Sequence, residues 1–358
     1  MSGPIRARVV SLMATPLEGL EEHLILEPDP APAEVAAHEV LVGVRAANVG
    51  WVDALMTSGQ YQHVPEVPYT PGLEFSGQVL GVGSAVTRFR PGDRVIADGL
   101  LTGPRSSGSH RRYGGFAAHA LAPEEGLIPL PHGYSFEEGA CFLAGAETAE
   151  HALIERAQLK SGEIALILGA TGSTGLAAVQ RAKAQGARVL AVGRSREKLE
   201  IARKLGADAA IVLGPGAPNL KDAVRAESGG RGADVVYDAV GGPLSVEALR
   251  AAAFGARFVL VGWAGTPTAA RGDRDPNTLP TNLILMKGID VLGSPAAIAA
   301  QRDPVLRQRR LAAVLARADA LRPHIGHTYA LREVHAALRA KLAGKHVGNV
   351  AIQVVTAP

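Results

Sequence analysis

The chain has 358 residues, of which 47% are hydrophobic and 20% carry a charge. These proportions are ordinary for a soluble globular protein and exclude disordered and fibrous classes, and the length is sufficient for two domains with their own cores. The formal net charge is only +3 without a block of like charges, so the composition does not indicate a nucleic-acid partner.

The sequence also lacks the signals of a membrane or secreted protein. No apolar run approaches the roughly 20 residues of a membrane span, and the start of the chain lacks the layout of a signal peptide. We therefore expect a cytoplasmic protein without a membrane partner. The single cysteine, Cys141, has apolar neighbours, which favours a buried structural thiol.

The first part of the chain, up to about residue 142, consists of short apolar runs separated by Gly, Pro and Asp. This pattern predicts a β-rich half. Gly, Pro, Ser and basic residues at 100–115 predict an exposed loop. The clearest strands are predicted at 40–44, 77–83 and 94–97.

The most informative stretch is 163–198, where an apolar run leads into a turn rich in glycine. Residues 164–168 have the composition of a buried parallel strand. Gly169, Gly172 and Gly175 follow this strand. Glycines at such a turn let the backbone bend tightly and approach a pyrophosphate without a Cβ in the way.

A helix is predicted directly after this turn, because apolar residues recur at helical spacing until Gly186, which is suited to end it. The first N–H groups of the helix, at Ser173, Thr174 and Gly175, would point toward the glycine turn. The partial positive charge there favours an anion. The order of strand, turn and helix therefore predicts a dinucleotide site.

The second strand of this unit, at 188–192, distinguishes between the two nicotinamide cofactors. An Asp or Glu at its end would bind a bare ribose 2′-OH and repel a 2′-phosphate. The chain instead continues with Gly193, Arg194 and Ser195, and Lys198 follows. These groups suit a phosphate, so NADPH is predicted over NADH. The alternative is that the basic residues are only a solvated helix start.

After about residue 144 strands and helices alternate, which predicts an α/β domain with a doubly wound parallel sheet of six strands. The later strands of this sheet are predicted at 211–213, 235–238, 258–261 and 291–292. Helices at 305–321 and 331–342 and a strand at 349–354 follow. The last strand has no predicted partner in its own segment, so we expect it to return to the β-rich half.

Several short motifs outside the cofactor unit share the pattern of a known family. They are Asp-Ala-Leu-Met at 53–56, Ser-Gly-Gln-Tyr at 58–61, Pro-Tyr-Thr-Pro-Gly-Leu-Glu-Phe-Ser-Gly at 68–77, Pro-Gly-Asp-Arg-Val at 91–95, Tyr-Gly-Gly-Phe-Ala at 113–117 and Thr-Ala at 148–149. With the cofactor unit, they make the chain resemble the medium-chain dehydrogenase/reductase superfamily over nearly its whole length, and within it the zinc-independent quinone oxidoreductase-like branch.

This resemblance implies a fold and a domain organisation. It implies a GroES-like catalytic domain at 1–143, a Rossmann NADPH-binding domain at 144–296 and a C-terminal segment at 297–358 that returns to the catalytic domain. NADPH is expected to meet its substrate in a cleft between the two domains.

The resemblance also bears on metal binding. Zinc-dependent members of the superfamily use a Cys and a His as ligands, and Gly50 and Leu73 stand at those places here. Neither side chain binds a metal, so we predict no metal site. Without a Lewis acid to stabilise an alkoxide, hydride delivery to a conjugated acceptor is favoured over alcohol oxidation.

Candidate side chains follow from the same resemblance. Tyr61 stands where related enoyl thioester reductases carry a Tyr that hydrogen-bonds the substrate or passes it a proton; the alternative, which the sequence favours slightly, is an ordinary aromatic residue at a loop edge. Asn48 is a possible substitute for a family Asn that Gly50 replaces. Thr148 resembles a family Thr near the nicotinamide, but Glu150 replaces the aromatic residue common after Thr-Ala.

The ends of two later strands are further candidates, because the carboxyl ends of strands line the ligand crevice in such sheets. Ala239 and Val240 follow the fourth strand, and Gly262 and Trp263 follow the fifth. We expect backbone contacts to the cofactor there, with a packing role as the alternative for Trp263. By resemblance, two further residues lie near the nicotinamide end: Ser294 and Asn349.

Three functions remain open at this stage. The first is an NADPH-dependent reductase of quinones or α,β-unsaturated carbonyls, which the family resemblance suggests is a homodimer formed through the edge of the Rossmann sheet. The second is an enoyl thioester reductase, for which Arg105, Arg111 and Arg112 are candidates to bind the carrier's phosphates. The third is an NADPH-binding protein without turnover, because fold does not determine function.

Overall fold

The computed structural model describes residues 3–12, 17–61, 63, 65–106, 108–216, 218–265 and 278–354. The chain forms two compact units. Unit 1 contains Met1–Ala144 and His324–Pro358, and unit 2 contains Gly145–Pro323. The segment 297–323, which the sequence analysis assigned to the C-terminal segment, lies in unit 2.

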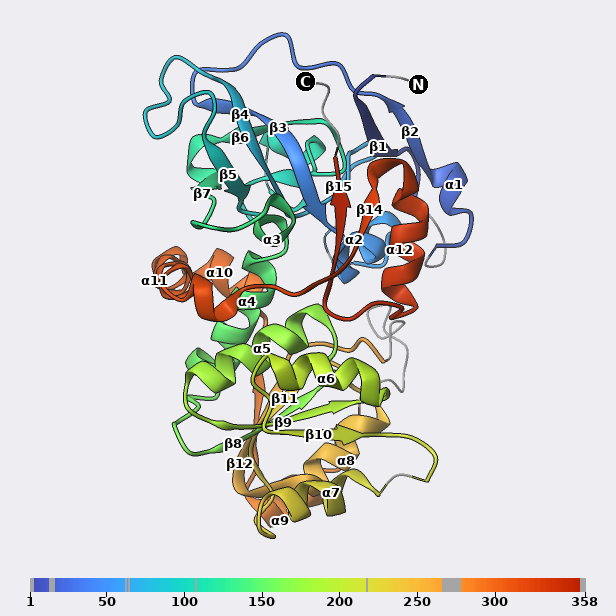
Figure 1. Ribbon diagram of the computed structural model, residues 1–358, viewed down its shortest axis with the longest axis vertical. Helices are drawn as coiled ribbons and strands as arrows, with labels where there is room; N and C mark the ends of the chain where they lie inside the picture. Colours follow the sequence, from blue (N-terminus) through green and yellow to red (C-terminus); the bar gives the residue numbers. More distant parts are fainter. Residues whose placement is uncertain are drawn as a thin grey trace. The chain divides into compact units, whose positions relative to one another are not determined.

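Unit 1 is built around a mixed β-sheet with the strand order β14-β15-β3-β4-β5-β7, in which β6 also pairs with β3 (Figure 1). Its strands are β3 (Glu39–Asn48), β4 (Phe75–Val82), β5 (Arg94–Ala97), β6 (His119–Pro123), β7 (Leu127–Pro129), β14 (Ile325–Ala330) and β15 (Asn349–Gln353). A separate two-stranded sheet contains β1 (Ile5–Val9) and β2 (Leu24–Pro28). The helices are α1 (Leu20–His23), α2 (Trp51–Thr57), α3 (Phe136–Ala140) and α12 (Val334–Leu342). The prediction of a β-rich first half is confirmed.

The C-terminal strand β15 returns to the N-terminal half, as expected, and pairs antiparallel with β3 so that Ala351 lies opposite Asn48. It also pairs in parallel with β14. The expectation that it has no partner in its own segment was therefore wrong. Most side chains of β14 are at least partly exposed, and His327 and Thr328 interrupt the apolar alternation by which a strand is recognised.

The loop predicted at 100–115 is only partly exposed. Thr102 is fully buried and its Oγ1 donates a hydrogen bond of 2.8 Å to the carbonyl of Asp98. Ser106 is also buried, and its Oγ donates to the carbonyl of Gly103 at 2.7 Å. Such local bonds satisfy hydroxyl groups without solvent, so a polar segment can pack against the sheet.

Unit 2 contains a six-stranded sheet in the order β10-β9-β8-β11-β12-β13, and all five neighbouring pairs are parallel. Its strands are β8 (Ile164–Leu168), β9 (Arg188–Gly193), β10 (Ala209–Val212), β11 (Ala233–Asp238), β12 (Ala252–Leu260) and β13 (Asp290–Gly293). Figure 1 shows α5 (Ser173–Ala184) and α6 (Arg196–Lys204) on one face, and α7 (Leu220–Glu227), α8 (Pro243–Ala251) and α9 (Thr281–Lys287) on the other. The doubly wound parallel sheet is therefore confirmed.

The remaining helices of unit 2 precede and follow this sheet in the chain. Helix α4 (Leu143–Ala149) runs directly into a π-helix, η4 (Glu150–Arg156), and after β13 come α10 (Ala296–Arg302) and α11 (Pro304–Leu315). The π-helix is a rare conformation that occurs frequently at functional sites.

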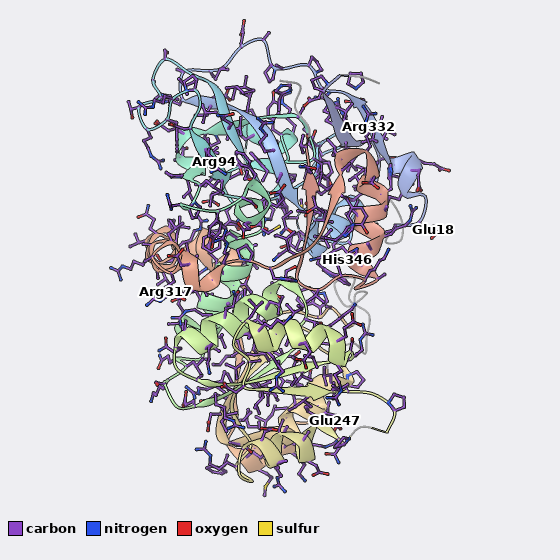
Figure 2. The ribbon with its side chains drawn as sticks, viewed as in Figure 1. Glu18, Arg94, Glu247, Arg317, Arg332 and His346 are labelled. Atoms are coloured by element: carbon purple, nitrogen blue, oxygen red, sulfur yellow. The ribbon has the colours of Figure 1, made fainter. Side chains whose placement is uncertain are left out.

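Each unit has its own apolar core. In unit 2 every residue of β8 is buried, as expected for a strand covered by helices on both faces. In unit 1 a basic side chain, that of Arg94 (Figure 2), joins the sheet to a helix. Its guanidinium lies 4.5 Å from the ring centre of Phe136 and donates to the carbonyl of Tyr134 at 3.0 Å. Strand β5 is thereby fixed to α3.

Candidate cofactor site

The glycine turn of unit 2 connects β8 to α5. Gly169 has a positive φ of 69°, which favours glycine. A Cβ on Gly175 would lie 2.2 Å from the carbonyl oxygen of Gly169, so a larger residue would not allow this close approach. The residue before the helix, the exposed Gly172, has no side chain that caps the first turn. The turn and the helix start therefore fit a pyrophosphate, which would meet backbone N–H groups there.

The first turn of α5 is supported from the sheet. Ser173 and Thr174 are half-buried, and the phenol of Tyr237 on β11 donates to the carbonyl of Thr174 at 3.5 Å. Burial raises the pKa of Tyr237, so its hydroxyl stays protonated as a donor. The predicted phosphate-binding residues are thus held by a buried side chain that sequence reasoning did not identify.

The end of β9 lies beside this turn. The N–H of Ala170 donates to the carbonyl of Val192 at 3.0 Å. After Gly193, the Oγ of Ser195 accepts a hydrogen bond of 3.3 Å from the N–H of Lys198 and so caps α6. Ser195 therefore has a structural role at the start of α6.

The two basic residues of this segment differ in burial. Arg194 is exposed, and Lys198, on the first turn of α6, is half-buried. Both belong to the segment that follows β9, where the sequence predicts the 2′-phosphate.

The loop after β11 is organised by a buried acid. The carboxylate of Asp238 accepts hydrogen bonds of 2.9 Å from the N–H groups of Val240 and Gly241, and a further one from the hydroxyl of Ser245. Sequence reasoning assigned no role to the side chain of Asp238. The signal was present, because a carboxylate followed by Ala-Val-Gly-Gly can accept backbone N–H groups of its own turn.

The loops after β8, β11 and β12 contact one another at the carboxyl edge of the sheet. Ala264 donates to the carbonyl of Ala239 at 3.2 Å, and Gly265 donates to that of Val240 at 2.7 Å. A Cβ on Gly169 would lie 2.9 Å from Val240. The structure thus brings together the candidate residues of these loops, which include Gly262 and the 40% exposed Trp263.

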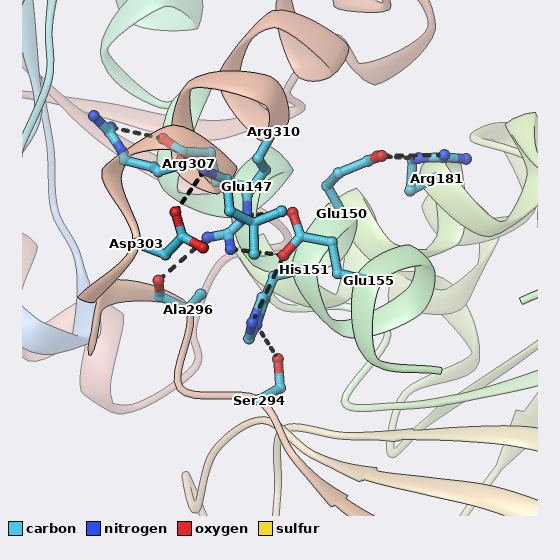
Figure 3. A network of polar contacts seen from close by, with 11 residues as sticks. Glu147, Glu150, His151, Glu155, Arg181, Ser294, Ala296, Asp303, Arg307 and Arg310 are labelled. Carbon is cyan, nitrogen blue, oxygen red and sulfur yellow. Dashed lines mark hydrogen bonds and ion pairs between the residues drawn. The ribbon is translucent and has the colours of Figure 1, made fainter. Parts of the chain in front are cut away.

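Ser294 lies in a network of polar contacts around α4 and η4 (Figure 3), and Thr148 lies on α4. Thr148 is half-buried. The hydroxyl of Ser294 forms a 2.8 Å hydrogen bond with Nδ1 of His151, and the N–H of Ser294 donates to the carbonyl of Leu260 at 2.9 Å. The network also contains three ion pairs: Glu147 with Arg307, Glu150 with Arg181, and Glu155 with Arg310.

The other three candidates lie in unit 1. The Nδ2 of Asn48 donates to Glu74 at 2.7 Å, and its Oδ1 accepts a 3.5 Å hydrogen bond from the buried thiol of Cys141. The Nδ2 of Asn349 donates to the carbonyl of His324 at 3.2 Å. Tyr61 is half-buried after α2, and its N–H donates to the carbonyl of Leu55 at 3.2 Å.

Two buried acids hold the backbone of unit 1 near Asn48. The carboxylate of Asp53 accepts from the N–H groups of Gly50, Gly72 and Leu73 at 2.8, 3.1 and 3.0 Å. Burial raises the pKa of Asp53 to about 6 and that of Glu74 to about 7. Sequence reasoning assigned no role to either acid, although both belong to the motifs that carry the resemblance.

Arg105 faces the same region of unit 1. Its charge lowers the pKa of both Asp53 and Glu74 against the larger effect of burial, and its Nε donates to the carbonyl of Gly99 at 3.3 Å. The guanidinium of Arg112 lies 5.4 Å from the ring centre of Tyr113. These contacts give two of the three loop arginines a partner within the protein.

Within the described part of the chain, no group of three or more His, Cys, Asp or Glu is arranged to hold a metal ion. None of the described helices is both long and apolar enough to cross a bilayer.

The chain matches two family models. Residues 36–132 match the alcohol dehydrogenase GroES-like domain, and residues 173–303 match the model described as zinc-binding dehydrogenase. A curated relative, quinone oxidoreductase-like protein 2 of Bos taurus, is 34% identical over 334 residues, which is 92% of this chain and 89% of the relative.

Solved structures agree with this result. A probable oxidoreductase from Mycobacterium abscessus has a TM-score of 0.80 and 26% identity, covering 98% of both chains. The quinone oxidoreductase of Thermus thermophilus, solved alone and in complex with NADPH, has a TM-score of 0.76 and 29% identity, covering 98% of this chain and all of its own.

Proposed function

The chain belongs to the medium-chain dehydrogenase/reductase superfamily, in its quinone oxidoreductase-like branch, and from this premise we propose that it is an NADPH-dependent oxidoreductase that reduces a quinone or an α,β-unsaturated carbonyl without zinc. One observation carries the choice of cofactor. Strand β9 ends without an acid, and Arg194 and Lys198 follow it beside the glycine turn. The NADPH complex of the Thermus thermophilus relative supports the same choice.

Different groups of unit 2 bind different parts of NADPH. Arg194 and Lys198 bind the 2′-phosphate, and the first N–H groups of α5 bind the pyrophosphate. The loops fixed by Asp238 present their backbone to the nicotinamide half. When bound, the cofactor supplies a hydride to the acceptor.

The substrate side of the proposal rests on unit 1. Tyr61 donates a hydrogen bond to the carbonyl oxygen of the acceptor, or passes its proton to the reduced product. Gly50 offers no side chain to a metal, and its N–H is bound by Asp53. Leu73 offers only an alkyl group, so these two positions fit a zinc-free reaction.

We further propose that the enzyme is a homodimer. Phe254, Leu285 and Met286 are 83%, 80% and 74% exposed, an unusual exposure for large apolar side chains. Phe254 lies on β12, and Leu285 and Met286 lie on α9, which precedes β13 in the chain. β13 is the last strand of the six-stranded sheet, and its outer edge has no partner strand within the described residues. A second copy would cover both the apolar residues and the free strand edge.

The experiment that tests this function is a consumption assay for NADPH and NADH with a chelator present. The acceptors are 1,4-benzoquinone, an alkenal and a crotonyl thioester. Turnover of the quinone or alkenal with NADPH preferred supports the proposal, and preference for the thioester would favour an enoyl thioester reductase. Tight binding of NADPH without consumption of any acceptor would favour a non-catalytic NADPH-binding protein instead.

A further inference from the structure

His151 is a buried titratable residue to which the function above assigns no role. It lies on the π-helix η4, and its Nδ1 is 2.8 Å from the hydroxyl oxygen of Ser294 (Figure 3). Its Nε2 lies 3.8 Å from Oε2 of Glu155. Each ring nitrogen therefore faces a different side chain, and the direction of both contacts depends on which nitrogen carries the proton.

The surroundings of His151 select one tautomer. Burial, together with the charge of Arg310, lowers the pKa of His151 to about 4, so the ring is neutral near pH 7. Both side-chain oxygens of Glu155 accept hydrogen bonds of 2.7 Å from Arg310, whose third nitrogen donates to the carbonyl of Ala296. A bare Nε2 would repel this carboxylate, so the proton lies on Nε2.

The tautomer fixes the Ser294 hydroxyl. An unprotonated Nδ1 only accepts, so the Ser294 O–H donates to it. The oxygen of Ser294 is then left with lone pairs and no proton to offer. Toward any other partner, this hydroxyl is an acceptor.

The fold assigns Ser294 to the nicotinamide half of the site. In a sheet of this strand order the dinucleotide lies along the carboxyl ends of the strands, across the point where the order reverses between β8 and β11. The adenosine half lies toward β9, where Arg194 stands, so the nicotinamide half lies toward β11, β12 and β13. Ser294 directly follows β13 and is bonded to the end of β12.

We propose that His151 is a positioning residue that holds Ser294 as a hydrogen-bond acceptor for the carboxamide N–H of the nicotinamide ring. This inference rests on the proposed function. The pair His151 and Ser294 would then favour cofactors whose ring carries an amide donor, and would orient the ring by that bond.

Binding measurements by titration calorimetry test this inference without turnover. Three ligands are compared: NADP⁺, its 3-acetylpyridine analogue, in which a methyl group replaces the amide NH₂, and 2′,5′-ADP, which lacks the nicotinamide half. One hydrogen bond corresponds to a preference of roughly threefold to tenfold for NADP⁺ over the analogue in the wild type. The affinity for 2′,5′-ADP tests only the adenosine half of the proposed cofactor site and does not depend on contacts to the nicotinamide.

Four variants test whether His151 positions Ser294 or only stabilises the fold. Ser294→Ala should abolish the preference for NADP⁺ and leave the affinities for the analogue and for 2′,5′-ADP unchanged. His151→Leu should reduce the preference in the same way, and His151→Asn, whose amide oxygen can accept in place of Nδ1, should restore most of it. The control Ser161→Ala, near the amino end of β8, should keep the wild-type ratio.

The outcomes distinguish a failure of this inference from a failure of the proposed function. A ratio that stays at the wild-type value in both Ser294→Ala and His151→Leu overturns the inference, and so does a wild-type ratio near one. Either result leaves the proposed function intact if 2′,5′-ADP still binds. Failure of the wild type to bind 2′,5′-ADP overturns the proposed cofactor site and the inference with it. Should His151→Leu not fold, Ser294→Ala alone decides.

Discussion

The carboxylate of Glu150 and the guanidinium of Arg181 form an ion pair in which both side chains are almost completely buried. Glu150 is the first residue of η4, two residues after Thr148, and Arg181 lies on α5, the helix that begins at the glycine turn. The pair therefore fixes the Thr148 segment to the helix that would bind the pyrophosphate. Glu150, which departs from the family pattern by replacing an aromatic residue, thus pairs with Arg181 within the same unit.

Removing one member of this pair should destabilise the protein strongly. Glu150→Leu leaves the Arg181 charge buried without its partner, which should lower the free energy of unfolding by about 3–5 kcal/mol in urea titrations. The double variant Glu150→Leu with Arg181→Leu should recover most of this loss. The exposed pair Glu247 and Arg250 is the control, since Glu247→Ala should cost less than about 1 kcal/mol. Equal losses in the single and double variants would contradict this account.

The basic segment after β9 should determine the preference between NADPH and NADH. Replacing Arg194 and Lys198 with Ala removes charge-assisted contacts to the 2′-phosphate, and we expect NADPH affinity to fall about 10- to 100-fold. NADH lacks this phosphate, so its affinity should change less than about twofold. The double variant Arg203→Ala with Lys204→Ala, at the far end of α6, is the matched control for the loss of two positive charges. Equal losses for both cofactors would show that the 2′-phosphate binds elsewhere.

The sequence predicted the α/β unit well because its signals are local. The apolar run of β8, the glycine turn and the helical spacing of α5 lie within about two dozen residues, and the six strands follow in regular alternation. Strand β14 was missed because its mostly exposed residues carry no apolar period. Pairing with β15 selects its conformation, and such pairing is a tertiary property.

The polar contacts of the site could not be predicted for the same reason, because they join residues far apart in the chain. Asn48 and Ser294 were chosen as cofactor contacts by resemblance, but their neighbours were not predictable. Asn48 meets Glu74 and Cys141, which are 26 and 93 residues distant in the chain, and Ser294 meets His151 across 143 residues. Composition and spacing carry no information on such pairs. The roles of Asn48 and Ser294 as cofactor contacts stay predictions, and the hydrogen bonds that constrain both side chains became visible only in the fold.

Asp238 should matter for the loop at the carboxyl end of β11. Asp238→Ala leaves the N–H groups of Val240 and Gly241 without their acceptor, which should lower the free energy of unfolding by about 2–4 kcal/mol and weaken NADP⁺ binding. Asp238→Asn keeps an oxygen for both N–H groups and a donor for Ser245, so it should cost about 1 kcal/mol or less. Urea titration and calorimetry measure both effects. Equal losses for Ala and Asn would show that charge matters more than the bonds.

The buried acid Glu74 should make stability depend on pH. Its pKa is raised from 4.5 to about 7 in the folded protein, so the folded state binds more protons than the unfolded state between these values. The free energy of unfolding therefore loses the Glu74 contribution as pH rises from 4.5 through 7. His151 has the opposite sign, because its lowered pKa of about 4 adds stability as pH rises toward 6.5.

A variant isolates the Glu74 contribution from the others. Glu74→Gln cannot ionise, so its stability relative to the wild type should increase by about 2 kcal/mol between pH 5 and pH 8. Urea titrations of both proteins at each pH measure this difference. A difference that is constant with pH would mean that Glu74 keeps the same protonation state in the folded and unfolded protein over this range.

The apolar surface formed by Phe254, Leu285 and Met286 should mediate assembly. Gly288, at the end of α9, lies against the ring of Phe254, so the exposed side chains of Leu285 and Met286 border the same surface as this ring. Sedimentation of the wild type should give the mass of two chains, and Leu285→Lys with Met286→Lys should shift it toward one, because a second copy would have to bury two charges. Val305→Lys, at a 60% exposed position on α11, adds a charge elsewhere and should leave the mass unchanged. A wild-type mass equal to one chain would rule out the dimer and leave this surface for a different partner.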